Sequence, residues 1–330
     1  MKIAVLDDYL RVARGLADWD SLGAQVDVFT EPLPDEEAVV TALSGYDVVV
    51  AMRERTPFPA SVLSRLPKLA LLVTTGPGNA AIDLDAARRL DITVTSTRYF
   101  PQPTVELTWA LILAAARLIP QSAESVRQGG WQVGLGTSLN RTTLGILGLG
   151  SIGTRVAKVG HAFGMEVVAW SQNLRPEDAQ AKGVRYVSCE ELFAGSDVLS
   201  IHLRLSERTR GIVGAGELRL MKASSILVNT SRGPLIDEAA LLRALNENWI
   251  AAAALDVFDR EPLPAEHPLR SAPNTVLTPH IGYVARDLFE VFYRDAVEDI
   301  AAWSAGSPLR TLTPPGPRTQ GPGRQPPASG

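Results

Sequence analysis

The sequence predicts an α/β protein of two domains, each built around a doubly wound parallel sheet. Short apolar runs alternate with helix-like segments along most of the chain, and such alternation joins parallel strands through covering helices. The chain has 330 residues, which is long for one hydrophobic core and suits two. A glycine pattern between a strand and a helix near the middle of the chain is the third indication.

The first part of the chain, up to residue 97, contains the apolar runs expected of one parallel sheet. A helix is predicted over residues 35–43, because Pro34 and acidic residues stand at its start. Pro101 and Pro103 remove backbone donors, so residues 98–103 are expected to cross between the domains. The strands of this part are expected at residues 3–6, 26–29, 47–52, 69–74 and 92–95.

The second part begins with a long helix expected over residues 104–117, followed by an arm over 121–140 that contains Trp131. The apolar stretch 107–119 includes Arg117 and is too short to span a bilayer, so it predicts a buried helix. Further strands are expected at residues 144–147, 165–170, 198–201, 226–229, 252–256 and 275–278, and helices at 154–163, 237–245 and 290–303.

The glycine pattern is G-x-G-x-x-G at Gly148, Gly150 and Gly153. The first glycine permits a tight turn, the second lets backbone N–H groups approach a pyrophosphate, and the third lets helix and strand pack closely. The N-terminus of the helix that follows offers unpaired donors and a partial positive charge to phosphates. The strand, turn, helix and strand therefore predict a dinucleotide-binding unit.

The amino-acid composition and the charge pattern exclude several classes of function. The net charge is −4 without tracts of like charge, which argues against a nucleic-acid surface. The single cysteine, Cys189, excludes an internal disulfide framework and fits a reducing cytoplasm. Charged residues interrupt the apolar run at residues 3–6, so no signal peptide is expected. We expect a cytoplasmic protein without a nucleic-acid or membrane partner, and a disordered tail over residues 313–330, which are rich in proline and glycine.

Three polar side chains follow predicted strands, at the sheet edge where open α/β proteins bind ligands: Arg232, Glu261 and His280. Together with the glycine pattern, their segments resemble the D-isomer specific 2-hydroxyacid dehydrogenases, from the N-terminus to about residue 310. The resemblance implies hydride transfer between NAD(P)(H) and a D-2-hydroxy acid or 2-keto acid, as in phosphoglycerate dehydrogenase-like and hydroxypyruvate or glyoxylate reductase-like members. It also implies a Rossmann domain, residues 99–285, inserted in a flavodoxin-like substrate domain, residues 1–98 and 286–312.

The resemblance assigns catalytic roles that are physically reasonable. His280 would be the general acid and base, because imidazole exchanges protons near neutral pH. Glu261 would bond the imidazole and favour its charged form. Arg232 would bind the substrate carboxylate and polarise the carbonyl, because its planar fork matches two oxygens. Taken alone, each has a plainer alternative: a surface charge for Arg232, a solvated turn for Glu261 and a backbone cap for His280.

The resemblance also implies the cofactor contacts. A carboxylate usually stands about 20 residues past the glycines and bonds the ribose 2′-hydroxyl. Ser171 stands there instead and Arg175 follows, so NAD is expected from the family but NADP stays open. Asp256 would hold the carboxamide end of the nicotinamide. The full expected set is Thr75, Gly148, Gly150, Ser151, Ile152, Gly153, Ser171, His202, Leu203, Thr230, Ser231, Asp256 and Gly282.

On the substrate side, the loop over residues 73–83 resembles the family loop that binds the substrate carboxylate through backbone N–H groups. Arg53 is expected to meet an acidic substrate, whereas Arg55 is expected to pair with an exposed acid. Tyr283 either contacts substrate or packs. The expected substrate contacts are Arg53, Thr75, Gly76, Arg232, His280 and Tyr283.

The sequence also bears on metal binding, on oligomeric state and on alternative functions. No residues show metal-ligand spacing, so no metal is expected. His267 lies in a proline-rich loop and is expected to be solvated. A homodimer is expected through the helix 104–117 and the arm 121–140. Two alternatives stay open: an NAD(H)-sensing corepressor-like binding protein of the same fold, and a dehydrogenase of the formate or phosphite type.

Overall fold

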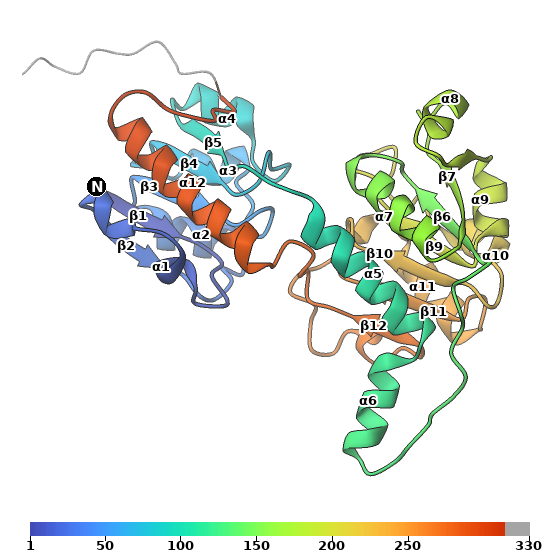
Figure 1. Cartoon of the computed structure of the whole chain (residues 1–330). Helices are drawn as coiled ribbons and strands as arrows, with labels where there is room; N and C mark the ends of the chain where they lie inside the picture. The colour runs from blue at the N-terminus through green and yellow to red at the C-terminus, as the bar shows by residue number, and fades with distance from the viewer. Residues whose placement is uncertain (314–330) are drawn as a thin grey trace, which may run out of the picture. The chain divides into compact units, whose positions relative to one another are not determined.

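The computed structural model describes residues 1–313. These residues form two compact units, one made of residues 1–99 with those from 286 onward, the other of residues 100–285. Both are α/β units with parallel sheets, which confirms the predicted fold class (Figure 1). Of the predicted tail, residues 314–330 lie outside the described part. Thr313 was assigned to that tail wrongly, because it is buried and its hydroxyl accepts a hydrogen bond of 2.9 Å from the backbone N–H of Val94.

The sheet of the first unit has five parallel strands in the order β2-β1-β3-β4-β5. This is the flavodoxin-like order, in which the chain reverses direction next to the first strand. Strands β3 and β4 are buried along their whole length, as expected of parallel strands covered on both faces. The strands are β1 (Lys2–Val5), β2 (Gln25–Val28), β3 (Val48–Ala51), β4 (Leu71–Thr74) and β5 (Thr93–Ser96).

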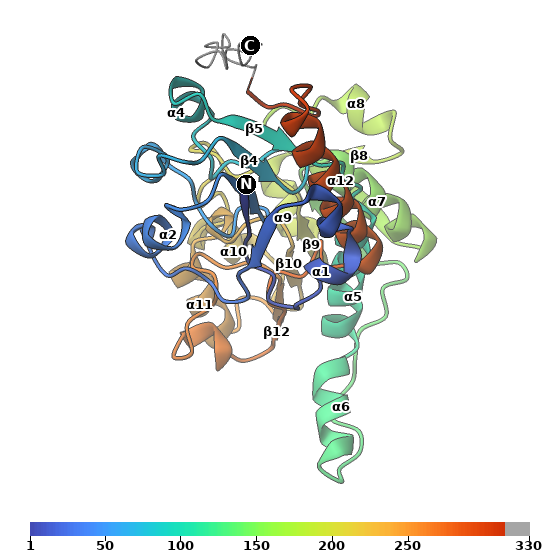
Figure 2. The same cartoon turned by 90° about the vertical axis from the view of Figure 1, so that its left-hand side faces the viewer.

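Helices cover both faces of this sheet (Figure 2). The side chains of α2 (Glu36–Leu43), α3 (Ala60–Leu63) and α4 (Leu84–Arg89) share a core with the strands. On the other face, α12 (Arg286–Ser304) packs with α1 (Ala13–Leu16) and the 3-10 turn η1 (Trp19–Leu22). Residues 310–313 then return to the sheet, where Thr311 pairs antiparallel with Thr95 of β5.

The sheet of the second unit has seven parallel strands in the order β12-β11-β10-β9-β6-β7-β8. The first strand of the unit, β6, lies between β7 and β9, so the strand order reverses beside it. In open α/β sheets this switch point is where ligands bind. The strands are β6 (Thr143–Leu147), β7 (Glu166–Trp170), β8 (Arg185–Tyr186), β9 (Val198–Ile201), β10 (Ile226–Asn229), β11 (Ala252–Leu255) and β12 (Thr275–Leu277).

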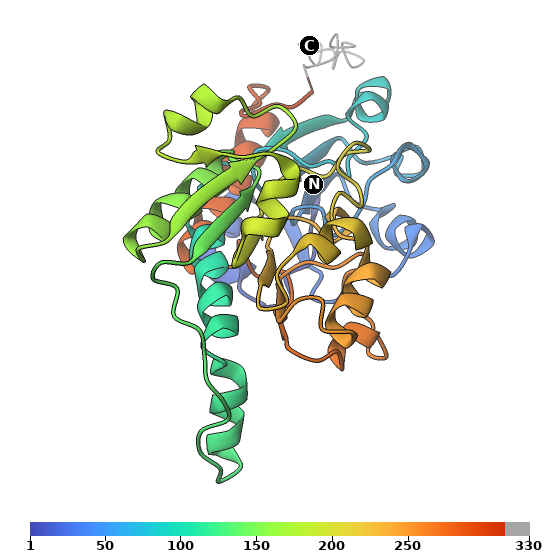
Figure 3. The same ribbon diagram turned by 90° about the vertical axis from the view of Figure 1, so that its right-hand side faces the viewer.

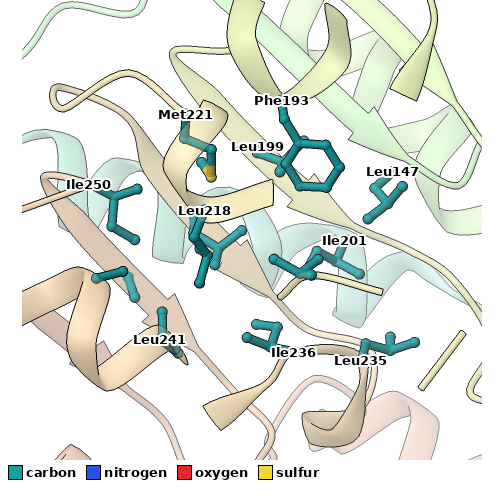
Figure 4. Close-up of a cluster of buried hydrophobic side chains, with 14 of the residues drawn as sticks. Leu147, Phe193, Leu199, Ile201, Leu218, Met221, Leu235, Ile236, Leu241 and Ile250 are labelled. Carbon is teal, nitrogen blue, oxygen red and sulfur yellow. The ribbon is translucent and has the colours of Figure 1, made fainter. Parts of the chain in front are cut away.

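Two apolar cores, one on each face, hold this sheet in place. On one face, α5 (Gln102–Ala116) and α7 (Ser151–Ala162) contribute Ile112 and Val156, which are both fully buried. On the other face, the core is formed by α9 (Cys189–Gly195), α10 (Ala215–Leu220) and α11 (Glu238–Asn246). It includes Phe193 of α9 and Leu218 of α10 (Figure 4). Full burial of such a side chain contributes roughly 1.5–3 kcal/mol. The remaining short elements are α6 (Ile119–Arg127), α8 (Pro176–Gln180) and the 3-10 turns η2 (Gly233–Leu235) and η3 (Pro268–Arg270).

Helix α6 and the segment after it extend away from the sheet of their unit (Figure 3). The sequence predicted an arm from residue 121, and its first part is helical. α6 buries none of its residues, and the arm carries exposed apolar side chains, among which Leu135 is 99% exposed. Within residues 1–313, no single helix is long and apolar enough to cross a membrane. The pair α5 and α6 meets the length and composition requirements together, but it bends by 65° at the break.

Candidate active site

The glycine turn lies between β6 and α7, at the switch point of the sheet. Gly148 has a φ of +103°, and a Cβ there would lie 2.7 Å from the carbonyl oxygen of His202. A Cβ at Gly153 would lie 2.2 Å from the oxygen of Gly148, so neither position has room for a side chain. A Cβ at Gly150 would meet nothing within 4 Å. The turn is therefore packed tightly at Gly148 and Gly153, whereas open space lies next to Gly150.

The residues of this turn fit a dinucleotide pyrophosphate. No side chain caps the N-terminus of α7, where Ser151, Ile152 and Gly153 form the first turn. The unpaired N–H groups and the helix dipole favour an anion beside the open space at Gly150. Lys182, which the sequence analysis missed, donates from Nζ to the carbonyl oxygen of Leu149 at 2.8 Å and fixes the turn from the side of α8.

His202 lies directly beside the turn. Its Nε2 is 2.9 Å from the hydroxyl of Ser200, whereas its Nδ1 is buried without a hydrogen-bond partner among residues 1–313. Burial lowers the pKa of His202 to about 3, so the ring is neutral at ordinary pH. A methyl carbon of Leu203 would lie 2.9 Å from a Cβ at Gly148, which places this side chain against the turn as well. An orphaned polar atom at this point fits a group that the protein itself does not supply.

The hydroxyls of Thr230 and Ser231, both expected to contact the cofactor, are used inside the unit. The Thr230 hydroxyl is 2.9 Å from that of Thr108, and the Ser231 hydroxyl donates to the carbonyl oxygen of Ile201 at 2.8 Å. These bonds join β10 to α5 and to β9. Ser171 is half-buried directly after β7, where it accepts a turn bond at 3.1 Å from Leu174. Cofactor contacts by these three residues stay predictions.

His280 and Glu261 are brought together by the loops after β12 and β11. Nδ1 of His280 is 2.5 Å from Oε2 of Glu261, and Oε1 of Glu261 accepts a bond of 2.9 Å from the backbone N–H of Phe258. The ring of Tyr283 lies edge-on to the imidazole, with centroids 5.4 Å apart. Both carboxylate oxygens are therefore committed. No hydrogen bond to Nε2 of His280 occurs within the described residues.

Asp256 holds the loop that carries His280. It is fully buried, and its Oδ1 accepts bonds from the hydroxyl of Thr278 at 2.6 Å and from the N–H of Ile281 at 2.8 Å. Its Oδ2 accepts a bond of 2.8 Å from the N–H of Gly282. Burial raises the pKa of Asp256 above its ordinary value. The sequence predicted a cofactor contact for Asp256 and Gly282. That contact stays a prediction, while anchoring of the loop is a role that sequence reasoning missed.

Arg232 stands after β10, at the start of η2. Its carbonyl oxygen accepts a bond of 2.9 Å from Asn229, and its Nη1 donates to the carbonyl oxygen of Ser231 at 2.6 Å. A Cβ at Gly233 would lie 2.1 Å from the backbone of Phe258, the residue that donates to Glu261. The segments of Arg232 and Glu261 are thus packed backbone to backbone. Arg232, Glu261 and His280 follow three adjacent strands in turn.

In the first unit, Arg53, Thr75 and Gly76 are brought together after β3 and β4. The N–H of Arg53 donates to the hydroxyl of Thr75 at 2.9 Å, and its Nη1 donates to the carbonyl oxygen of Thr75 at 3.3 Å. The guanidinium lies against Gly76, where a Cβ would be 1.8 Å from Nη1. Asn79, which was not predicted, donates to the carbonyl oxygen of Arg53 at 2.5 Å. These bonds clamp the two loops onto each other.

The backbone N–H groups of Thr75 and Gly76 are already used within the unit. Thr75 donates its N–H to Ala51 at 3.0 Å, and Gly76 donates to the hydroxyl of Thr97 at 2.7 Å. Carboxylate binding by Thr75 and Gly76 therefore stays a prediction. Nη1 of Arg55 donates to the backbone oxygen of Asp7, whose side chain is buried, and pairing of Arg55 with an exposed acid stays a prediction.

His267 is not solvated as the sequence suggested. Its Nε2 is 3.0 Å from Oε1 of Glu238, its Nδ1 accepts a bond of 3.3 Å from the N–H of Leu269, and its side chain is 17% exposed. Burial raises the pKa of the Cys189 thiol, which disfavours a reactive thiolate. No group of three His, Cys, Asp or Glu side chains in residues 1–313 is arranged to hold a metal ion.

The chain resembles known proteins in both sequence and fold. Residues 109–282 match the family model described as "D-isomer specific 2-hydroxyacid dehydrogenase, NAD binding domain". A glyoxylate reductase of Aeropyrum pernix is 41% identical over 286 residues, which are 84% of this chain and 85% of the relative. A putative D-3-phosphoglycerate dehydrogenase oxidoreductase from Ralstonia solanacearum has the same fold, with a TM-score of 0.91, 38% identity, and coverage of 95% of this chain and 97% of the other. A phosphoglycerate oxidoreductase from Vibrio cholerae aligns with a TM-score of 0.88 and 39% identity, over 93% of this chain and 99% of that structure.

Proposed function

The chain belongs to the D-isomer specific 2-hydroxyacid dehydrogenase family, and from this premise we propose that His280, Glu261 and Arg232 form its catalytic centre. The family makes the protein an oxidoreductase that uses a nicotinamide cofactor and acts on 2-hydroxy acids. The observation that carries the residue assignment is the pair of His280 and Glu261 at 2.5 Å, with no hydrogen bond to Nε2 of the imidazole in the described part of the chain.

In the proposed reaction, His280 moves the proton. When bound, the nicotinamide ring supplies or accepts the hydride. In the oxidation of a 2-hydroxy acid, Nε2 of His280 takes the proton of the hydroxyl group while the hydride leaves the carbon that bears this group. In the reduction, His280 returns the proton to the carbonyl oxygen. Glu261 holds Nδ1, which fixes the ring and stabilises the charged imidazolium. Asp256 keeps the loop of His280 in register.

Arg232 is proposed to bind the substrate carboxylate. Its guanidinium is planar and matches two oxygens, and its segment packs against the strand end that leads to Glu261. Arg53 is proposed as a second cation for an acidic substrate. Its side chain is 15% exposed and is braced by the loop of Thr75 and Gly76. Tyr283 is proposed to border the substrate, because its ring packs against that of His280.

The proposed substrate is a small 2-keto acid such as glyoxylate, as the name of the Aeropyrum pernix relative suggests. The direct test is a panel of 2-keto acids with both reduced cofactors. Glyoxylate or hydroxypyruvate should be reduced with NADH, and the His280→Ala variant should not support this turnover. Oxidation of formate or phosphite, with no turnover of 2-keto acids, would favour a dehydrogenase of the formate or phosphite type. NAD binding without any turnover, together with capture of a protein partner, would favour a corepressor-like role.

NAD rather than NADP is the proposed cofactor. Arg175, the cation nearest in sequence to Ser171, is bonded to Asp178 at 2.8 Å and lies 3.4 Å from Glu177. Its charge is therefore matched by two carboxylates that oppose a 2′-phosphate. A higher catalytic efficiency with NADPH than with NADH would contradict this choice.

The proposed assembly is a cytoplasmic homodimer formed through α5, α6 and the arm after them. The concentration of exposed apolar side chains on this projection supports it, since apolar surface that is gathered in one region often marks an interface. Light scattering should give the mass of a dimer for the wild type and of a monomer for a variant with Trp131 and Leu135 changed to serine. A monomeric wild type would contradict the proposal. The supporting side chains are Ile119, Val126, Trp131, Val133 and Leu135.

A further inference from the structure

Helix α8 begins with an ion-pair cluster that the catalytic proposal does not use. Nε of Arg175 is 2.8 Å from Oδ2 of Asp178, and its Nη2 is 3.1 Å from Oδ1 of the same carboxylate. Glu177 adds a third contact at 3.4 Å. The fork of the guanidinium thus faces both oxygens of Asp178, the arrangement in which arginine also binds phosphate.

The same helix flanks the cofactor turn. Its first residues follow the turn at Ser171, directly after β7. Just past its last residue, Lys182 is bonded to the carbonyl oxygen of Leu149 between two glycines of the turn. In this fold the ribose 2′ position of the dinucleotide lies at the end of the second strand, which here is β7. α8 is therefore held beside the part of the site that distinguishes NAD from NADP.

Two other cations beside the turn, Arg155 and Lys182, are also engaged. Nη1 of Arg155 donates to both the carbonyl and the hydroxyl oxygen of Ser151 at 2.8 Å. Lys182 is bonded to Leu149. Of these three cations, Arg175 is the nearest in sequence to the end of β7, and it is held by acids of its own helix.

We propose that Asp178, assisted by Glu177, is the residue that excludes NADP from this site. A carboxylate at the end of the second strand usually repels the 2′-phosphate, and here Ser171 stands in that position. Asp178 supplies the missing negative charge from α8 and at the same time keeps the fork of Arg175 occupied. A 2′-phosphate would have to break this pair and approach two carboxylates, whereas a 2′-hydroxyl requires neither. The inference rests on the proposed dehydrogenase function.

The test is direct titration of NAD and NADP by the quenching of protein fluorescence or by calorimetry, without substrate. Asp178→Asn should lower the Kd for NADP by about tenfold, the gain expected from one freed charge-assisted hydrogen bond, and change the Kd for NAD by less than about twofold. Glu177→Gln should give a smaller gain of about threefold, because its contact is longer. In the double variant Arg175→Ala with Asp178→Asn, most of the NADP gain should be lost.

Two matched controls separate this effect from others. Glu190→Gln removes an equal charge from the exposed first turn of α9, so it should leave both constants unchanged if net charge is not the cause. Lys182→Met should raise the Kd for NAD and the Kd for NADP by similar factors, because Lys182 holds the glycine turn and not the ribose 2′ position.

The outcomes distinguish this inference from the proposed function. Unchanged NADP affinity in both Asp178→Asn and Glu177→Gln, with NAD binding retained, would overturn the inference and leave the dehydrogenase assignment intact. Binding of neither cofactor to the wild type would refute both. If Asp178→Asn does not melt cooperatively, Glu177→Gln decides, and no gain in NADP affinity there would overturn the inference.

Discussion

The second unit contains two histidine–glutamate pairs, and only one is proposed to be catalytic. His280 and Glu261 are 2.5 Å apart, and His267 and Glu238 are 3.0 Å apart. The two imidazoles are almost equally exposed, at 19% and 17%. His267 also accepts a bond at Nδ1, so both of its nitrogens are used, whereas His280 has one bonded nitrogen among the described residues. A histidine–carboxylate pair becomes a proton-transfer site only if the second nitrogen is left for substrate.

The backbone sets the two pairs apart as well. His280 has a left-handed φ of 53°, in a loop whose N–H groups are held by the buried Asp256. His267 has an ordinary extended backbone and caps the 3-10 turn η3. Strained conformations of this kind concentrate at functional sites, because they persist only when the surroundings hold them. The following predictions test whether this difference separates catalysis from structure.

The largest effect is expected for His280→Ala. It removes the proposed proton carrier, so kcat/KM should fall by about 10³-fold, within the usual range for a general acid or base. The Kd for NAD should change by less than about twofold, since the glycine turn is untouched. His267→Ala is the matched control and should keep nearly full activity. Steady-state kinetics with equilibrium NAD titration measure both. An active His280→Ala variant would refute the assigned role.

A smaller loss of activity is expected for Glu261→Gln. The amide cannot stabilise the imidazolium as a carboxylate does, so kcat should fall by about 10- to 100-fold. Glu238→Gln makes the same chemical change in the other pair and should leave kcat within about twofold. Equal losses in the two variants, compared under the same assay, would remove the distinction between the pairs.

Asp256→Asn is expected to act on stability as well as on activity. An amide cannot accept all three bonds, and each buried donor left unpaired costs about 1–3 kcal/mol. Burial raises the pKa of Asp256, so the stability this group contributes is complete at low pH and is lost as the pH rises from about 4 through the raised value. The Asn variant should lack that decline. Urea unfolding at several pH values measures both effects, and a variant as stable as the wild type at every pH would contradict them.

The smallest effect is expected for His267→Ala. It removes the bond to Glu238 and the cap on η3, so the free energy of unfolding should fall by about 1 kcal/mol. Activity should change by less than about twofold, because neither nitrogen is proposed to reach substrate. A loss of kcat with unchanged stability would give His267 a catalytic role and would refute the distinction between the two histidine–glutamate pairs.

Most of the core could be predicted from the sequence. The strands at residues 198–201 and 226–229 were predicted with the bounds that β9 and β10 have, because each is an apolar run between polar residues. The start of α11 was clear from Asp237, which caps it by accepting a bond from Ala240. α9 was missed although Ser188 and Glu191 form a capping box, a pattern visible in the sequence. α6 was missed because the apolar pattern of α5 runs on past Leu118, where the chain turns with a φ of 53°.

The candidate site was predictable in part. Local order shows that Arg232, Glu261 and His280 follow strands, and the parallel sheet brings strand ends to one edge. Which carboxylate meets which histidine depends on the path of each loop. The bond from Glu261 to Phe258 and the bond from Glu238 to His267 have no signature in residue spacing. The roles of Asp256 and Lys182 were missed for the same reason, because their partners are backbone atoms, which every residue has.

On the ribosome, the two units reach completion at different times. The second unit is one continuous stretch, so its sheet has all of its strands once residue 277 has emerged. The first unit needs α12 and the segment that bonds β5, where Ser96 donates to Arg310 and Leu312 donates to Val94. The first 99 residues therefore stay incomplete while the inserted unit is synthesised, and an incomplete sheet exposes apolar surface and an unpaired strand edge that favour aggregation.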